Sequence, residues 1–492
     1  MRRAILPLGA AVAVVALGGL PSAGLLRAPT SATQDAGLRV ATNPALIPAF
    51  DPGVTDYVVR CSGSPIAVTV DAPADTTVSV DGHTAMTGRF STGISRSTGQ
   101  GFTLVARPRS GGVAQTYYVR CLPSDYPDFT ATRTGTTQAA FYLTVPLAGS
   151  GSGPGVGYPT IFDDEGVPIW WAPKTSTPFT ELLGDGDIAW TKSDGTPAEE
   201  RRLDGSLVAT ITTQGGPPDQ HDLLRLANGD HVVAADVVRT GVDLAAAWGP
   251  SYPSNASVMD QVIEELTPAG AVAWSWDAMA HIPLTETDPQ WRGQIMSGSY
   301  DAYHWNSVEW TGSGFLLSFR HLNAVYDVDQ RSSAIVWKLG GTPTAESLHV
   351  VGDPVFSAGG DFGGQHDARL LPDGSVTLFD DGTGLGRAPR AVRYRIDLPA
   401  HTATMLEQLT DPAAGSDSSF GGSARRLSGG DWVVGWGGTN TISELTGADT
   451  RVFLLQFGPG TSVYRAVPVA AGQLSRAALR AAMDKQYPEP RP

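Results

Sequence analysis

The fold is decided by three stretches that are imperfect copies of one motif. They read His221-Asp-Leu-Leu-Arg-Leu-Ala-Asn-Gly-Asp-His-Val-Val233, His304-Trp-Asn-Ser-Val-Glu-Trp-Thr-Gly-Ser-Gly-Phe-Leu-Leu317 and His366-Asp-Ala-Arg-Leu-Leu-Pro-Asp-Gly-Ser-Val-Thr-Leu378. Each copy has a polar start, a short strand, a turn that contains glycine and a second strand. In a circular array of such units, equivalent positions face one axis. We therefore expect the three leading histidines to meet at one site.

The remaining hairpins extend this pattern over residues 124–470. Turn residues that precede a hydrophobic strand recur at Leu183, Leu226, Trp310, Leu371 and Leu427. A second kind of hairpin alternates with the first, so that two hairpins make one four-stranded unit of about 45–60 residues, the period of a β-propeller. The strand 451–457 is expected to close the ring with strands near 141–145. We interpret residues 241–300, between two landmarks, as an irregular insertion that covers the site, rather than as an extra blade.

The block 38–122 precedes these repeats and has short alternating strands, which predict a small β-sandwich. Its stretch 43–59 resembles the cadherin-like β-sandwich modules of bacterial secreted proteins. Cys61 and Cys121 follow similar strand contexts and are the only cysteines. In an exported protein this favours a disulfide that ties the first and last strands of the block, with two buried free thiols as the alternative.

The two ends of the chain carry simpler signals. Met1-Arg-Arg3 and the apolar run 4–20 predict a secretory signal peptide and leader over 1–33, with a retained membrane anchor as the alternative. We expect a secreted or cell-envelope protein without any other membrane span. The tail 471–492 contains a possible short helix at 475–486. The formal net charge of −15 argues against nucleic acid as a partner, because phosphate binding needs a basic surface.

Two chemistries suit three histidines at one repeat position. Arg320 ends an apolar strand near His304, where a guanidinium needs an anionic partner: either a bound ligand or a carboxylate such as Glu309. Asn306 either donates to the same ligand or stabilises a turn. A metal site is less favoured, because the arginine repels a cation and no carboxylate occupies the repeat position. Transfer of an anionic group uses neutral imidazole as the nucleophile and the arginine to stabilise charge.

The central region also resembles a known family, the bacterial arylsulfate sulfotransferases. The resemblance covers about 140–470, and its strongest stretches are 220–222, 303–307, 318–326, 335–341 and 365–367. It implies an exported six-bladed β-propeller that moves a sulfuryl group from an aryl sulfate to a phenol without a nucleotide donor, a cofactor or a metal. By residue, it implies His366 as the nucleophile that forms a sulfohistidine. His221, His304 and Arg320 would bind sulfuryl oxygens and assist proton transfer, and Asn306 would help to bind the substrate.

Two other functions remain as alternatives. Sandwich and propeller together would also suit a non-catalytic cell-surface binding or adhesion protein, because a fold alone does not prove an enzyme. A histidine-ligated metalloenzyme is the other. The sequence makes no prediction about the oligomeric state.

Overall fold

The first strands of the chain form two small sheets. The computed structural model describes residues 37–63, 65–149 and 155–488, so the predicted signal peptide and leader lie outside the described residues. One sheet has the order β1 (Arg39–Asn43), β3 (Ile66–Ala72), β5 (Gly88–Ile94). The other has the order β2 (Asp56–Arg60), β7 (Gln115–Leu122), β6 (Gly101–Pro108), β4 (Thr76–Val80). Alternate apolar residues of both sheets share one hydrophobic cluster, as half-buried strands do.

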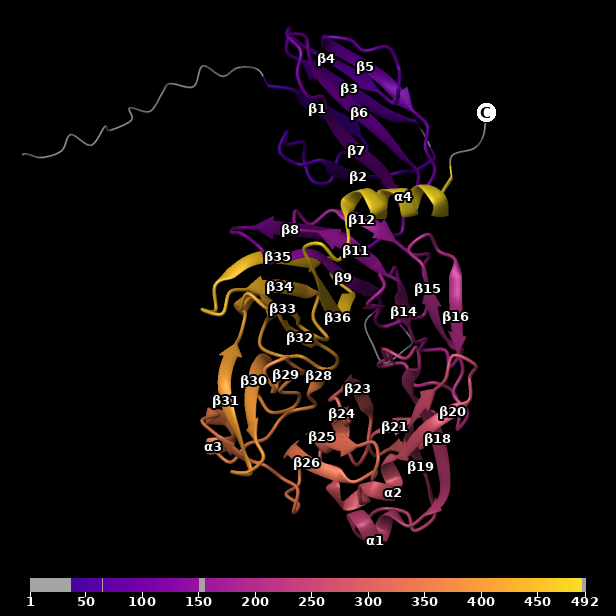
Figure 1. Cartoon of the computed structure of the whole chain (residues 1–492), viewed down its shortest axis with the longest axis vertical. Helices are drawn as coiled ribbons and strands as arrows, with labels where there is room; N and C mark the ends of the chain where they lie inside the picture. Colours follow the sequence, from indigo (N-terminus) through magenta and orange to yellow (C-terminus); the bar gives the residue numbers. More distant parts are fainter. Residues whose placement is uncertain (1–36, 64, 150–154, 489–492) are drawn as a thin grey trace, which may run out of the picture. The chain divides into compact units, whose positions relative to one another are not determined.

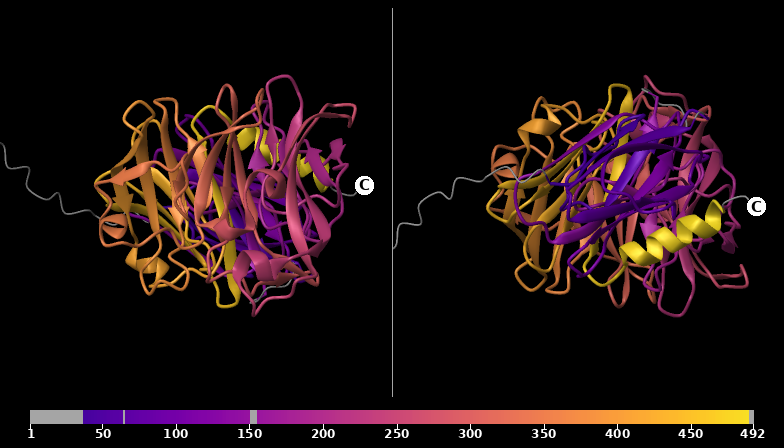
Figure 2. Two further views of the ribbon diagram at one scale, coloured as in Figure 1. Left: turned by 90° about the horizontal axis from the view of Figure 1, so that it is seen from below. Right: turned by 90° about the horizontal axis from the view of Figure 1, so that it is seen from above.

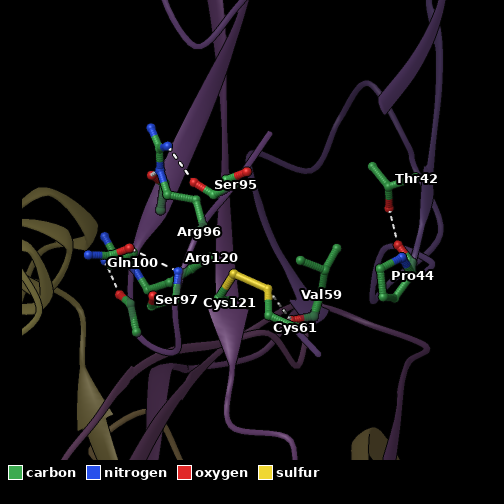
Figure 3. Close-up of a disulfide and its surroundings, with 12 residues drawn as sticks. Thr42, Pro44, Val59, Cys61, Ser95, Arg96, Ser97, Gln100, Arg120 and Cys121 are labelled. Carbon is green, nitrogen blue, oxygen red and sulfur yellow. Dashed lines mark hydrogen bonds between the residues drawn. A yellow bond between two sulfur atoms is a disulfide. The ribbon is translucent and has the colours of Figure 1, made fainter. Parts of the chain in front are cut away.

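A disulfide joins Cys61 to Cys121, as predicted, with their Cα atoms 5.4 Å apart. Figure 3 shows the bond between the end of β2 and β7. The two strands are parallel neighbours, with Val59 opposite Cys121. The expectation that the bond ties the first strand of the block was wrong, because β1 precedes β2 and lies in the other sheet. Disulfides are typical of proteins that fold in an oxidising compartment.

The rest of the chain is also built mainly from strands, which form larger sheets (Figure 1). The β9 sheet contains β10 (Val156–Gly157), β9 (Ala139–Ala148), β11 (Thr160–Asp163), β12 (Pro168–Trp171) and, beside β9, β36 (Thr461–Ala470). The β14 sheet contains β13 (Glu181–Leu182), β14 (Ile188–Trp190), β15 (Ala198–Arg201) and β16 (Leu207–Ile211). The β19 sheet contains β17 (Leu224–Arg225), β18 (His231–Val242), β19 (Ala256–Leu266), β20 (Val272–Asp277), β21 (Ile295–Met296) and β22 (Ser299–Asp301).

Three further sheets follow along the chain. The β24 sheet contains β23 (Trp305–Trp310), β24 (Gly314–Phe319), β25 (Ala324–Asp329) and β26 (Ile335–Gly340). The β30 sheet contains β27 (His349–Val351), β28 (His366–Leu370), β29 (Ser375–Asp380), β30 (Arg390–Asp397) and β31 (Thr402–Leu409). The β33 sheet contains β32 (Ser423–Arg426), β33 (Trp432–Gly435), β34 (Thr441–Leu445), β35 (Arg451–Phe457) and β8 (Phe129–Arg133).

Hydrophobic clusters lie between consecutive sheets. One cluster joins the β9, β14 and β19 sheets, and the next three join β19 to β24, β24 to β30, and β30 to β33. A fifth cluster joins the β33 sheet back to the β9 sheet. The packing is therefore cyclic, and Figures 1 and 2 show these sheets following one another in sequence colours. It brings one strand of each neighbouring sheet together: β23 packs against β28, β28 against β32, and β32 against β36.

Two expectations about the ring need correction. Residues 241–300 are not an irregular insertion throughout, because β19 and β20 lie inside this range and pair with each other and with β18. The strand 451–457 does not pair near 141–145: β35 pairs with β8, while β36 pairs with β9. The next strand along the chain, rather than the predicted one, thus makes the contact that joins the last sheet to the first.

Helices are few and short. They are α1 (Leu244–Trp248), α2 (Ala278–His281), α3 (Pro354–Ser357), α4 (Arg476–Gln486) and the 3₁₀ turns η1 (Leu284–Glu286), η2 (Arg320–Leu322) and η3 (Pro412–Ala414). The possible helix in the tail is therefore present, and Ser475 caps it by accepting from the Ala478 amide. Among the described residues, no helix has the length and apolar content needed to cross a bilayer.

Candidate active site

The three histidines of the repeat stand at or shortly before the start of an end strand in three consecutive sheets. His366 begins β28, His304 directly precedes β23, and His221 lies just before β17. The register of β23 shifts after Trp305, and that of β28 shifts after His366, so each strand has an irregularity near its histidine. Such bulges re-aim side chains. His304 itself has a φ of 55°, a left-handed conformation that is costly for a residue with a Cβ.

This placement brings the histidines into one buried cluster. The ring centres of His221 and His304 are 4.7 Å apart. The ring of Tyr464 lies 5.9 Å from that of His221 and 5.8 Å from that of His366. On the other side of His304, the ring of His321 stacks at 4.5 Å. His321 is not a member of the repeat, and its ring forms one wall of the site.

Arg320 brings a positive charge to this cluster, and no carboxylate of the described residues forms an ion pair with it. Its Nη2 donates to the Ser419 carbonyl at 2.7 Å, and its Nη1 lies 3.3 Å from His321 Nε2. Its guanidinium carbon lies 4.1 Å from the ring centre of Trp291. The side chain is 8% exposed, and its Nε has no hydrogen-bond partner in the described part of the chain. Glu309, the carboxylate considered as an alternative partner, lies instead 3.7 Å from Arg369.

The side chains of Trp291 and Arg320 pack close to Gly364, two residues before His366. Gly364 has a φ of 76°, and a Cβ at this position would lie 3.2 Å from Trp291 and 3.3 Å from Arg320. Any other residue there would displace one of these side chains. Gly364 is therefore the position that lets the guanidinium lie beside the segment that carries His366.

Each of the three histidines has its own aspartate at Nδ1. The Nδ1–carboxylate distances are 2.7 Å for His221 and Asp219, 2.5 Å for His304 and Asp301, and 2.6 Å for His366 and Asp381. Pairs of this kind fix the tautomer and the orientation of an imidazole. Because all three rings use Nδ1 for the protein, all three keep Nε2 for a ligand. These aspartates were not predicted from the sequence.

The tautomer of His366 follows from a second contact. Its Nδ1 lies 2.8 Å from the Gly364 carbonyl oxygen, which only accepts hydrogen bonds. Nδ1 therefore carries the hydrogen, and in the neutral ring the lone pair is on Nε2. Burial lowers the pKa of His366 well below its usual value, and the charge of Arg320 lowers this pKa further. The ring is thus neutral at pH 7, as a nucleophile must be.

Burial acts on the neighbouring groups in different directions. It raises the pKa of Asp381 well above its usual value, against the opposing charge of Arg320. Asp301 is also buried, but its interactions with His304 and His321, including the hydrogen bond with His304, lower its pKa, so this carboxylate stays ionised. Burial lowers the pKa of His321 to about 3 and also lowers that of His304. The site therefore combines the neutral imidazoles of His304, His321 and His366 with a guanidinium that has no carboxylate at ion-pair distance among the described residues, which suits an anionic ligand.

The aspartates that directly follow two of the histidines have a separate task. Asp222 accepts from Arg465 at 2.7 Å and from Arg369 at 2.8 Å. Asp367 accepts from Arg369 at 2.9 Å and from Arg425 at 2.8 Å. These buried carboxylates are paired and hydrogen-bonded, as buried charges must be. They link β28 to β32, and the segment before β17 to β28 and β36. The His-Asp dipeptides thus couple a ligand-facing imidazole to a structural ion pair.

Asn306 supports the site from behind. It is fully buried, and its Nδ2 donates to the carbonyl of Gln365 at 2.7 Å, directly before His366. One of its two amide hydrogens is used on the backbone, so Asn306 positions the segment before His366, and the second hydrogen remains for a ligand. Its Oδ1 has no partner among the described residues.

One group in the site has donor atoms suited to a metal. Asp301, His304 and His321 each offer one such atom, and these atoms lie within 4.8 Å of one another. Both histidines already direct Nδ1 toward oxygen atoms of Asp301. Arg320 also lies 3.3 Å from His321, and its positive charge opposes a cation. These residues fit a metal less well than they fit an anion.

Several residues of the site were not predicted from the sequence. Asp219 and Asp301 stand two and three positions before their histidines, a local signal that could have been used. Asp381, Trp291 and Tyr464 come from other segments and carry no signal of their own. Trp291 shows that the second half of the expected covering segment, 241–300, does reach the site.

Comparisons with known proteins give one clear match. A family model described as Arylsulfotransferase (ASST) matches residues 163–458. No curated protein matches the chain. Similar solved structures include a selenomethionine-substituted virginiamycin B lyase from Staphylococcus aureus, with 13% identity, a TM-score of 0.34, and coverage of 71% of this chain and 91% of that one. An auxiliary nutrient binding protein from Bacteroides ovatus has 12% identity, a TM-score of 0.32, and coverage of 83% and 86%. These structural likenesses are too distant to carry an argument.

Proposed function

The chain belongs to the arylsulfotransferase (ASST) family, and from this premise we propose that it moves a sulfuryl group from an aryl sulfate to a phenol through His366. The observation that carries the proposal is the free, neutral Nε2 of His366 beside the unpaired guanidinium of Arg320. A metal or a nucleotide is not part of this route. The family match supports the reaction class, and the site geometry supports the roles of the residues.

In the first half of the reaction, His366 Nε2 attacks the sulfur of the aryl sulfate. An N–S bond forms, the aryl O–S bond breaks, and the electron pair leaves with the phenolate. Positive charge develops on the imidazole, and Asp381 stabilises it by accepting from Nδ1–H. In the second half, the oxygen of the acceptor phenol attacks the sulfur, the N–S bond breaks and its electron pair returns to Nε2. The proton of the phenol goes to His221 or His304.

The other members of the site stabilise charge. Arg320, His221 and His304 bind the sulfuryl oxygens, where preorganised donors in a dry site are most effective. His221 and His304 also exchange a proton with the phenol oxygens, and Asp219 and Asp301 stabilise the charged form of each ring. Asn306 and Gly364 hold the backbone around His366. The covalent intermediate divides one difficult transfer into two easier ones, and each step is helped because phenolate is a good leaving group.

We also propose the architecture and location that suit this function. The cyclic sheets between Phe129 and Ala470 are the six blades of a β-propeller, and the two sheets of residues 38–122 are a cadherin-like β-sandwich. Export through the signal peptide at 1–33 agrees with the disulfide.

The test is a kinetic assay with a chromogenic aryl sulfate, with and without a phenol. Phenol release that depends on the acceptor, with parallel lines in two-substrate plots, is the expected result. Intersecting lines would indicate direct transfer instead. Activity that vanishes after chelation and returns with a metal ion would support the metalloenzyme alternative.

A further inference from the structure

Tyr464 is a buried phenol that lies between two of the histidines. It belongs to β36, the strand beside β9, and is 5% exposed. Its ring contacts those of His221 and His366 at centre distances of 5.9 and 5.8 Å. It is the one described tyrosine whose ring lies within 6 Å of both histidine rings. No motif of the sequence pointed to it.

The hydroxyl of Tyr464 has no hydrogen-bond partner among the described residues. Other buried tyrosines do have one. The hydroxyl of Tyr142 donates to Glu444 at 2.6 Å, that of Tyr303 to the Ile282 carbonyl at 2.9 Å, and that of Tyr326 to Glu286 at 2.8 Å. A buried polar group without a partner is costly, and native proteins keep one where a ligand completes it.

The surroundings keep this hydroxyl protonated. Burial raises the pKa of Tyr464, and the carboxylates of Asp222 and Asp219 raise it further, against the charge of Arg465. Both carboxylates are already committed, Asp222 to arginines and Asp219 to His221. The hydroxyl is therefore a neutral donor at the site where the proposed function puts an anion.

We infer that the hydroxyl of Tyr464 donates a hydrogen bond to a sulfuryl oxygen while the group is carried between the phenols and His366. The inference rests on the proposed function and adds a further catalytic residue to it. A neutral donor stabilises charge on the transferring oxygens without adding a second fixed positive charge beside Arg320. It also leaves His221 and His304 free for proton transfer.

The test compares Tyr464→Phe with the matched variant Tyr142→Phe in the full-length protein. The kcat/KM is measured for aryl sulfates whose leaving phenols range from 4-nitrophenol to phenol. We expect Tyr464→Phe to lose about 100-fold with every substrate, as for removal of one preorganised donor. Its Tm should stay the same or rise, because its hydroxyl has no partner in the protein. Tyr142→Phe should keep kcat/KM and lower Tm, because it loses its bond to Glu444.

Three outcomes would overturn the inference: Tyr464→Phe with wild-type kcat/KM, a loss that grows as the leaving phenol becomes more basic, or sulfation of Tyr464 itself. The second would make Tyr464 a proton donor to the phenolate, and the third an acceptor.

A second measurement separates this inference from the proposed function. Binding of inorganic sulfate is measured by calorimetry, where we expect Tyr464→Phe to weaken Kd about 10-fold. If the wild type has no sulfotransferase activity but Tyr464→Phe still binds sulfate more weakly than the wild type, only the proposed function is contradicted. Unchanged sulfate affinity would contradict the inference.

Discussion

Arg320 is a buried cation held by an aromatic face, a carbonyl and a histidine, with no carboxylate at ion-pair distance in the described chain. Such a charge is costly unless an anion completes it. Arg320→Lys should lower kcat/KM about 100–1,000-fold, because a point charge does not reproduce a planar two-pronged contact. Arg331→Lys, at an exposed position, is the matched control and should act like wild type. Wild-type rates in Arg320→Lys would exclude a direct contact with the sulfuryl group.

The pH dependence reports on the imidazole of His366. Protonation of Nε2 removes the lone pair, so activity falls as the pH drops through the pKa of this ring. Because burial and neighbouring charges lower that pKa, the acid limb of kcat/KM should lie below about pH 6.5, the ordinary value for histidine. A pH profile of the first half-reaction measures it. An acid limb above pH 6.5 would require a group other than His366.

At the scale of elements, the segment between β20 and β23 completes the site from one side. It supplies Trp291, whose face supports Arg320, and Asp301, which holds His304. Trp291→Leu should lower kcat/KM about 30-fold, since a desolvated cation–π contact contributes about 2 kcal/mol. Part of this decrease in kcat/KM should appear as a higher KM for the aryl sulfate donor. Trp310→Leu, on the outer part of β23, is the control. Equal activity in both variants would mean that Arg320 needs no support from this segment.

The sequence predicted the repeated elements better than their connections. The positions of His221, His304 and His366 follow from a local pattern of strand, turn and strand, which is why they could be identified. The pairing of β36 with β9 depends on contacts between distant segments, and no local pattern distinguishes β36 from β35 in this respect. Asp381 and Tyr464 escaped for the same reason, since their distances to His366 exist only in the folded chain.

At the scale of the whole molecule, α4 links the N-terminal sheets to the sheets that follow them in the chain. Arg480 donates to Asp56 of β2 at 2.7 Å, and Arg120 of β7 donates to Asp484 at 2.7 Å. Removing the disulfide by Cys61→Ser with Cys121→Ser should destabilise this region by about 4 kcal/mol, because the bond closes a loop with a sequence separation of 60 residues.

The two cysteines lie in or beside the N-terminal sheets, and the histidines lie in or beside other sheets. We therefore expect an unchanged kcat/KM at a temperature where the variant stays folded. Thermal unfolding with and without reductant measures the loss of stability. An unchanged Tm would show that the bond does not limit unfolding, and a lost kcat/KM would link the N-terminal sheets to catalysis.

The central claim is that His366 carries the sulfuryl group between two phenols, and trapping that intermediate tests it most directly. The protein is mixed briefly with a labelled aryl sulfate in the absence of acceptor, quenched in alkali because N-sulfonated imidazole is acid-labile, and mapped by peptides. The account predicts one label on the peptide that contains His366, its loss when a phenol is added before the quench, and no label in His366→Ala. His349→Ala, at an exposed position, should label like wild type. Label on any other residue, or full activity of His366→Ala, would contradict the account.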